Sequence, residues 1–221
     1  MTTNNTNMTI PDRYTSFEVF VSKDTFKFNA AHFVAFRGFR ERLHGHNYKV
    51  SVRLCGSRKI GADGYVIDFG NVKDVTKSVC KKLNEYFLCP IHSPVLKINI
   101  TKKDGIEQSV HIECEDGTFF VFPRQDVALL PLAHATAEEL AIYLYGEILN
   151  GLDAEYLSKR GIHTMEVTVA EAPGQEAIFR LEIPVDKEQR ARSFDVCKYI
   201  TEGEIIPLPC INKGCVQCKD S

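Results

Sequence analysis

A run of alternating apolar residues that begins with two histidines constrains this chain more than any other feature of its sequence. The run consists of His44, His46, Tyr48, Val50, Val52 and Leu54. Side chains two positions apart on a β-strand point to the same face of the sheet. A second run of this kind consists of Phe26, Phe28, Ala30 and His32. The sequence therefore predicts two strands that each place histidine at the end of an apolar face.

Two segments show the spacing of three or four residues that is typical of an amphipathic helix. The first follows a predicted short turn and strand at residues 64–69, with Asp68 as its N-cap or first-turn acid, and continues to about residue 87. Its apolar positions are Val72, Val75, Val79, Leu83 and Phe87. The second begins at Thr136, where Glu139 completes a capping box, and we expect Gly151 to end it.

The remaining signals complete an α+β pattern. Asp116-Gly117 lies between two β-prone runs in residues 110–122 and predicts a hairpin. Later alternating runs predict two more strands, with Met165, Val167, Val169 and Glu171 on one and Phe179, Leu181 and Ile183 on the other. This order predicts an antiparallel sheet with two helices on one face, plus a hairpin insert. We expect a disordered N-terminal tail at 1–15, one domain at 16–184 and a C-terminal extension at 185–221.

Charge and hydropathy exclude several functional classes. The 27 basic residues are balanced by 29 acidic ones, and the net charge of −2 lacks the basic excess of a general nucleic-acid binder. No apolar run approaches the ~18 residues of a membrane span. The N-terminus lacks the pattern of a secretory signal, so we expect a cytoplasmic protein. A P-loop is excluded because the chain has no GxxxxGK motif.

The chain has eight cysteines, which in a reducing compartment are thiols or metal ligands rather than disulfides. Four of them lie in the extension: Cys197, Cys210, Cys215 and Cys218. The spacing Cys215-x-x-Cys218 is that of zinc ligands, and free thiols are the alternative interpretation.

The strongest candidate site combines His32 with His44-Gly45-His46. Two histidines two apart on a strand project the same way, and a third from a neighbouring strand can complete a triangle. Three neutral imidazoles are good zinc ligands and leave one coordination position for water or substrate. The alternative is that three partly buried histidines simply end their strands.

The sequence segments around these histidines resemble the 6-pyruvoyl-tetrahydropterin synthase family, which includes the 6-carboxytetrahydropterin synthases. They are FNAAH, HGHNYKVSV, GYVIDFGNVK, TAEELA and VTVAEAPGQEAIF, in the family's order over about residues 17–183. The resemblance implies a T-fold, in which a four-stranded antiparallel sheet carries two helices, and assembly into trimers and then a homohexamer. It also implies Zn²⁺ held by His32, His44 and His46, with 7,8-dihydroneopterin triphosphate as substrate.

The resemblance implies a pterin-binding role for three further residues. Glu171 ends an apolar strand face, where a carboxylate matches the two adjacent N–H donors of an aminopyrimidine. The alternative is a solvated glutamate at a strand end. Thr136 and Glu138 match the pterin-contacting start of a helix, although Thr136 is also explained as an N-cap.

The chain departs from the family pattern before the HGH motif, where the catalytic cysteine is missing. Glu41 stands three residues before His44 instead, an arrangement that resembles a variant branch in which glutamate replaces the cysteine. That branch cleaves the substrate side chain to 6-hydroxymethyl-7,8-dihydropterin, a folate precursor. A carboxylate is a suitable base for this retro-aldol step when desolvation raises its pKa. The alternative is a loop glutamate paired with Arg40 or Arg42.

A second departure concerns the proton shuttle. Where the family shows Leu-Asp-His, this chain has Leu83-Asn84-Glu85. Glu85, His92 or His134 is a candidate replacement, and His134, two residues before Thr136, is the best placed by sequence.

These features favour a zinc-dependent lyase that acts on dihydroneopterin triphosphate and releases 6-hydroxymethyl-7,8-dihydropterin. One alternative is the pyruvoyl-forming synthase of tetrahydrobiopterin biosynthesis. A second is a non-catalytic pterin-binding or assembly protein, and a third is an interaction module that works through its cysteine-rich tail.

Overall fold

The computed structural model of the chain describes residues 16–56, 60–184, 186, 188 and 194–200. The tail predicted at 1–15 and the Cys215-x-x-Cys218 motif lie outside the described residues, as does Cys210. The elements are β1 (Phe17–His32), β2 (Ala35–Phe36), β3 (Phe39–Arg40), β4 (His44–Gly56), α1 (Phe69–Lys81), β5 (Tyr86–Pro90), β6 (Leu96–Lys103), β7 (Ile106–Cys114), β8 (Phe119–Pro123), the 3-10 turn η2 (Arg124–Asp126), β9 (Val127–Leu130), α2 (Ala137–Leu152), α3 (Ala154–Lys159), β10 (Ile162–Ala172), β11 (Gln175–Glu182) and the 3-10 turn η3 (Val196–Tyr199).

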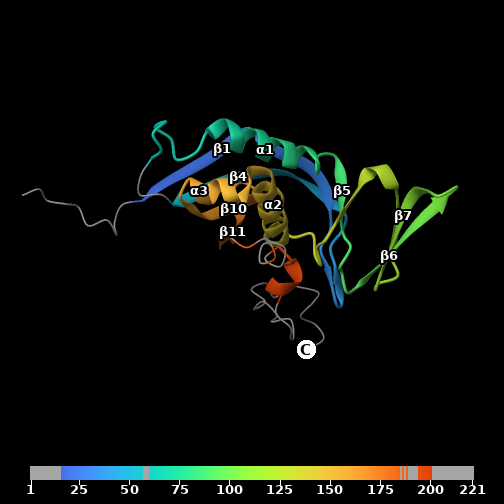
Figure 1. Cartoon of the computed structure of the whole chain (residues 1–221). Helices are drawn as coiled ribbons and strands as arrows, with labels where there is room; N and C mark the ends of the chain where they lie inside the picture. Colours follow the sequence, from blue (N-terminus) through green and yellow to red (C-terminus); the bar gives the residue numbers. More distant parts are fainter. Residues whose placement is uncertain (1–15, 57–59, 185, 187, 189–193, 201–221) are drawn as a thin grey trace, which may run out of the picture.

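The main sheet has the strand order β11-β10-β4-β1-β5-β9 (Figure 1). Its first four strands pair antiparallel, which confirms the predicted sheet. The prediction missed two short strands, β5 and β9, which extend the sheet in parallel beyond β1. Between β1 and β4 the register pairs His32 with His44 and Ala30 with His46, so the two predicted histidine-bearing ends meet.

Both long helices pack on the same apolar sheet face and on each other. The faces of β1, β4 and β10 that carry Phe28, Val52 and Val167 are fully buried beneath them. Burial of this face is the main source of stability in such a two-layer fold.

The start of α1 was predicted correctly, but the segments on either side were not. Asp68 caps the helix by accepting a hydrogen bond from the backbone N–H of Gly70. The strand predicted at 64–69 is absent, and the backbone carbonyl of Val66 accepts from Arg160 Nε instead. The helix ends at Lys81, and Phe87 belongs to β5.

The early end of α1 is caused by hydrogen bonds to β1, which is distant in sequence. The Asn84 side chain accepts from the backbone N–H of Asn29, and the N–H of Glu85 donates to the Asn29 carbonyl at 2.6 Å. Glu85 has a φ of 68°, which no helical residue adopts. The edge of β1 therefore redirects the chain out of the helix and into β5.

The predicted cap of α2 is half correct. Thr136 accepts from the backbone N–H of Glu139, as a capping box requires. The Glu139 carboxylate, however, turns to the backbone N–H groups of Ala133 and His134.

The expected stop at Gly151 is wrong, because α2 continues to Leu152 and Asp153 caps its end with a φ of 63°. Gly151 instead allows α2 to approach α1 closely. A Cβ atom at this position would lie 2.5 Å from Cγ1 of Val75. A β-branched side chain has little freedom to move away.

We expect Gly151→Ala to lower the free energy of unfolding by up to about 2 kcal/mol, because an overpacking cost of ~1–3 kcal/mol outweighs the ~1 kcal/mol that alanine adds to a helix. Urea denaturation would measure the change. In a Val75→Ala background the same substitution should stabilise the protein. Equal effects in the two backgrounds would contradict the close-approach explanation.

The hairpin predicted around Asp116-Gly117 is confirmed as β7 and β8, and β6 adds a third strand to this inserted sheet. The insert stands beside the main sheet in Figure 1. It has its own apolar core, which includes Val110 and Ile112 from β7 and Phe33 from the chain just after β1.

The described part of the C-terminal extension packs on α2. The ring of Phe194 lies 5.7 Å from that of Tyr145, and Val196 is buried. The boundary at residue 185 stays a prediction. Among the described residues, no helix is long and apolar enough to cross a membrane.

Candidate metal centre and pterin pocket

Three imidazoles converge where the paired strands β1 and β4 end. The ring centroids lie 4.5 Å apart for His32 and His44, 5.1 Å for His32 and His46, and 5.0 Å for His44 and His46. One nitrogen from each ring lies within 4.8 Å of the other two. The β-ladder creates this triangle, because it places His32 directly opposite His44.

Hydrogen bonds orient two of these rings. His32 Nδ1 lies 2.7 Å from the carbonyl oxygen of Ala135, and His44 Nδ1 lies 2.7 Å from that of Arg42. Since a carbonyl only accepts, Nδ1 carries the hydrogen in both rings and the Nε2 lone pair is left for a ligand.

The His32 ring fits a metal for a further reason. Its Nε2 atom is buried and has no hydrogen-bond partner among the described residues, and the residue is only 2 % exposed. Burial lowers the pKa of His32, and the neighbouring His44 lowers it further against the raising effect of the Ala135 hydrogen bond. A lowered pKa leaves the ring neutral at pH 7, which is the form that binds a metal. The three-nitrogen donor set therefore fits Zn²⁺.

We expect the purified protein to bind about one zinc ion per chain and His44→Ala to lose it, because two ligands seldom retain the metal. Metal analysis after dialysis against dilute Zn²⁺ would measure the ratio. His111→Ala, which alters a histidine of the insert, is the matched control. A wild-type protein that binds no zinc would favour the alternative of histidines that merely end their strands.

Glu41 lies on the β-hairpin between His32 and His44. Its backbone N–H donates to the carbonyl of Val34 at 2.9 Å, and its Oε2 accepts from the N–H of Val34 at 3.0 Å. These bonds tie the half-buried glutamate to the backbone two residues after His32.

The expected alternative pairing of Glu41 with an arginine is not observed. The Arg40 guanidinium pairs with Asp116 and reaches only the backbone carbonyl of Glu41. Within the described part of the chain, the Glu41 carboxylate takes part in no ion pair.

Tyr48 connects Glu41, Glu171 and the histidines. Its ring centroid lies 5.9 Å from that of His32 and 5.5 Å from that of His46, and its hydroxyl donates to Glu171 Oε1 at 3.3 Å. Burial raises the pKa of the Tyr48 hydroxyl, and the charges of Glu171 and Glu41 raise it further. Tyr48 therefore stays protonated beside the carboxylate of Glu171.

Glu171 opens onto a cavity of about 440 Å³, whose lining also includes the metal-site residue His46 and Lys49. A predicted pterin anchor and a predicted zinc ligand thus share one pocket. A volume of this size suits a small-molecule ligand.

The start of α2 lies beside the metal centre. Ala135, whose carbonyl holds His32, directly precedes Thr136, and Glu138 is exposed in the first helical turn. His134 Nδ1 lies 2.7 Å from Oε1 of Glu139, a side chain that is 8 % exposed. His134 therefore belongs to a carboxylate–histidine pair.

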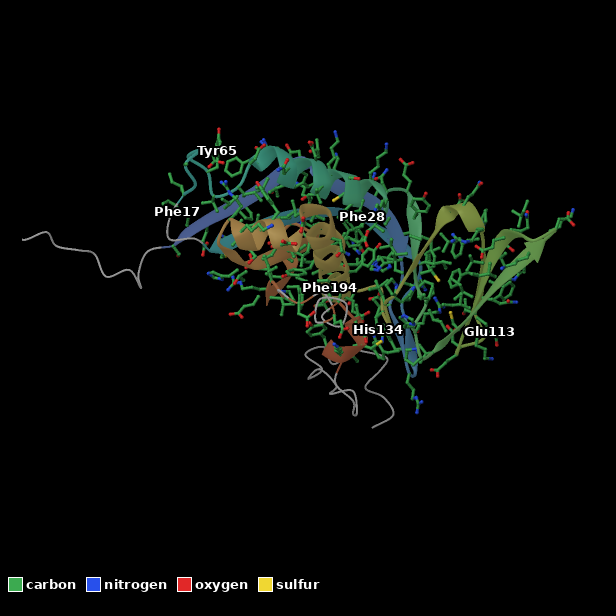
Figure 2. All side chains as sticks on the ribbon, in the orientation of Figure 1. Phe17, Phe28, Tyr65, Glu113, His134 and Phe194 are labelled. Carbon is green, nitrogen blue, oxygen red and sulfur yellow. The ribbon has the colours of Figure 1, made fainter. Side chains whose placement is uncertain are left out.

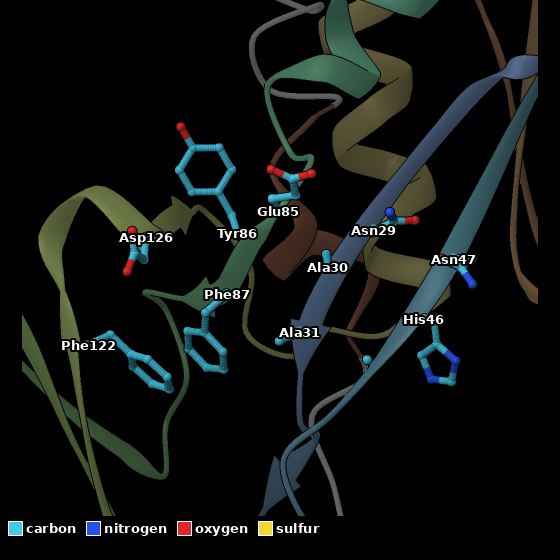
Figure 3. A pocket seen from close by; sticks show the side chains of 11 residues that line it. Asn29, Ala30, Ala31, His46, Asn47, Glu85, Tyr86, Phe87, Phe122 and Asp126 are labelled. Atoms are coloured by element: carbon cyan, nitrogen blue, oxygen red, sulfur yellow. The ribbon is translucent and has the colours of Figure 1, made fainter.

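Glu85 is not brought to the three imidazoles within one chain. It lines a second pocket of about 520 Å³ together with Asn29, Asp126 and His46, and in Figure 3 the His46 ring points away from both acids. Asn29 alternates with the inward-facing Ala30, so this pocket opens on the sheet face opposite the helices. His92 is exposed, and the structure gives it no described contact with the site.

Sequence reasoning missed two site residues, Tyr48 and Glu139. Tyr48 shares the strand parity of His44 and His46, which was the available signal. Glu139 was identified only as a helix cap, and the spacing gave no sign that its carboxylate would turn to His134.

Comparisons with known proteins agree on one family. The model of the 6-pyruvoyl tetrahydropterin synthase family matches residues 21–182. A Methanocaldococcus jannaschii protein, provisionally named 6-carboxy-5,6,7,8-tetrahydropterin synthase, is 32 % identical over 154 residues, which cover 70 % of this chain and 89 % of that protein.

Solved structures of 6-pyruvoyl tetrahydropterin synthases are similar in fold as well as sequence. The Plasmodium falciparum structure has a TM-score of 0.72 and 42 % identity, and covers 76 % of this chain and 99 % of its own. A Plasmodium vivax structure has a TM-score of 0.71 and 41 % identity, with the same coverage. Two further P. vivax structures carry alanine or cysteine in place of a glutamate described as a catalytic residue.

Proposed function

Because the chain belongs to the 6-pyruvoyl tetrahydropterin synthase family and has its T-fold, we propose that it is a zinc-dependent lyase acting on 7,8-dihydroneopterin triphosphate. The product proposed is 6-hydroxymethyl-7,8-dihydropterin, for folate synthesis. The observation that carries the proposal is the placement of Glu41, whose Oε2 is held by the N–H of Val34, two residues after His32, and whose charge raises the pKa of Tyr48. The catalytic glutamate described in a P. vivax relative that is 40 % identical supports it.

His32, His44 and His46 would hold the zinc ion, whose donor set was described above. When bound, zinc supplies a Lewis acid that lowers the pKa of a substrate hydroxyl. The protein contributes the orientation of the rings through the Ala135 and Arg42 carbonyls.

Glu41 is the proposed general base. Its carboxylate takes the proton of the second side-chain hydroxyl of the substrate. The bond between the first and second side-chain carbons then breaks, and its electron pair passes to the first carbon and the conjugated pterin ring. A proton returns to the first carbon, which keeps its hydroxyl as hydroxymethyl, and the second carbon leaves as an aldehyde that bears the triphosphate.

We propose His134 as the group that returns this proton. Its Nδ1 is bonded to the buried Glu139, which leaves Nε2 free to exchange protons. Glu85 and His92 were the other candidates, but the Glu85 pocket opens on the far sheet face and His92 has no described contact with the site.

We expect the protein to convert 7,8-dihydroneopterin triphosphate to 6-hydroxymethyl-7,8-dihydropterin and Glu41→Gln to slow this reaction about 10²–10⁴-fold, the usual contribution of a general base. Chromatography of the oxidised, fluorescent pterins would identify the product. Glu155→Gln, on the exposed face of α3, is the control.

Other products would change the conclusion in specific ways. A pyruvoyl product would favour the synthase of tetrahydrobiopterin biosynthesis. Turnover that is unchanged in Glu41→Gln would refute the assignment of the base. Binding of pterin without any product would favour the non-catalytic alternative.

Glu171 is the proposed pterin anchor, because its carboxylate faces the cavity that it shares with His46. Thr136 and Glu138 are proposed to contact the pterin from the start of α2, where unpaired backbone N–H groups are available.

We expect Glu171→Gln to weaken pterin binding roughly 10–100-fold, since a hydrogen bond to a charged group contributes about 1.5–3 kcal/mol. Fluorescence titration with a dihydropterin would measure the affinity. Glu176→Gln, on the rim of the same cavity, should bind as the wild type does. Equal losses in both variants would indicate a general effect of charge.

We also propose a cytoplasmic homohexamer, built as a dimer of trimers. Support comes from the open edge strand β11, on which Ile178 is 59 % exposed. An exposed edge strand of this length favours pairing with another copy.

A further inference from the structure

We infer that the inserted sheet β6-β7-β8 positions the catalytic glutamate, and that Arg40 and Asp116 form the latch between them. The inference rests on the proposed function, because it assigns a role to parts of the chain around Glu41. Two segments are involved: the Glu41 hairpin, residues 34–41, and the insert turn, residues 114–118.

The Glu41 hairpin and the insert turn are joined by three direct side-chain contacts. Arg40 Nε donates to Asp116 Oδ2 at 2.8 Å, and Arg40 Nη2 donates to Thr118 Oγ1 at 3.2 Å. At the tip of the hairpin, the backbone N–H of Gly38 donates to Glu115 Oε2 at 3.2 Å. These contacts span about 77 residues of sequence, so the fold has brought two separate turns together.

Arg40 links the latch to the catalytic residue itself. Its remaining nitrogen, Nη1, donates to the backbone carbonyl of Glu41 at 2.7 Å. The side chain is only 18 % exposed, and its guanidinium lies 5.7 Å from the ring centroid of Phe120 on β8. Because a guanidinium is planar and rigid, fixing two of its nitrogens on the insert fixes the third on Glu41.

A hydrogen bond within the insert turn orients Asp116 toward Arg40. Asp116 Oδ1 accepts from the backbone N–H of Thr118 at 2.9 Å while Oδ2 pairs with Arg40. The Thr118 N–H and then the Arg40 guanidinium hold the pKa of Asp116 below its usual range. The Asp116 carboxylate is therefore charged at neutral pH and pairs with the Arg40 guanidinium.

The insert also supports the other side of the site. Phe33, which directly follows His32, stacks on Phe120 at a centroid distance of 5.1 Å and is 1 % exposed in the core of the insert. The chain is thus held by the insert just after the metal-site residue His32 and again at Glu41.

None of the latch residues lines the cavity that contains Glu171 and His46. A loosened latch should therefore slow the chemical step and leave pterin binding unchanged. A displacement of a catalytic group by about 1 Å can cost roughly a hundredfold in rate.

The experiment compares Asp116→Ala, Arg40→Met and the double variant with the wild type. We expect each single variant to lower kcat about 10–100-fold with KM within twofold, and to retain the wild-type zinc content. The double variant should be no slower than the slower single variant, because both changes break the same contact between Arg40 and Asp116. Arg40→Lys should recover only part of the rate, since ammonium cannot make the three bonds.

Glu113→Ala is the matched control. It lies on the same insert, in Figure 2 at the opposite end of the molecule from Phe17, and breaks only the exposed ion pair with Lys97. Its kcat should equal that of the wild type. A kcat in Asp116→Ala equal to that of this control would overturn the inference, as would losses that are additive in the double variant.

Hydrogen exchange of a peptide that covers residues 36–43 separates this inference from the proposed function. Exchange at least tenfold faster in Asp116→Ala than in Glu113→Ala supports the latch. Unchanged exchange overturns it. If the wild type turns over no pterin triphosphate, the proposed function fails, and faster exchange still shows that the insert holds the hairpin.

Discussion

The antiparallel register between β1 and β4 is the constraint on which the rest of the structure depends. Because His32 pairs with His44 and Ala30 pairs with His46, one nitrogen from each of the three histidines lies within 4.8 Å of the other two. A shift of β4 by one residue would turn His44 and His46 to the opposite face of the sheet from His32. Apolar burial favours this register, since Phe28, Tyr48 and Val52 share the core face and are fully buried in it.

Next to the three histidines, Tyr48 interacts with two acidic residues. Glu171 on β10 accepts a hydrogen bond from the Tyr48 hydroxyl. The charge of Glu41, on the hairpin that joins β1 to β4, raises the pKa of Tyr48. The site therefore combines three imidazoles, a protonated phenol and two acidic side chains. In the proposed function, the imidazoles bind the cation and other groups move protons, which is the separation that acid–base chemistry at a metal requires.

The local sequence predicted what depends on periodicity and caps. The four antiparallel strands, the start of α1 at Asp68 and the hairpin at Asp116-Gly117 follow from side-chain spacing and turn chemistry. The histidine triangle could be predicted because two of its members share a strand face. The roles of the residues around the triangle were predicted from the resemblance to the family, above all the role of Glu171 as a pterin anchor.

The errors arose where distant contacts override local preference. Phe87 has helical spacing, but the edge of β1 captures the segment before it and converts it to β5. Gly151 has the composition of a helix end, yet it serves the approach of α1. The Glu139 carboxylate has the spacing of a capping box and pairs with His134 instead. The first two outcomes depend on residues far away in sequence, whereas Glu139 pairs with a histidine only five positions before it.

The hydrogen bond from His32 to Ala135 spans 103 residues, and it has a consequence for how the protein matures. During synthesis both histidine-bearing strands leave the ribosome long before the carbonyl that orients the first ring exists. Contacts between such distant segments form late, after the entropy of closing the intervening chain has been overcome. The complete three-nitrogen site proposed for zinc therefore forms only in an almost complete polypeptide.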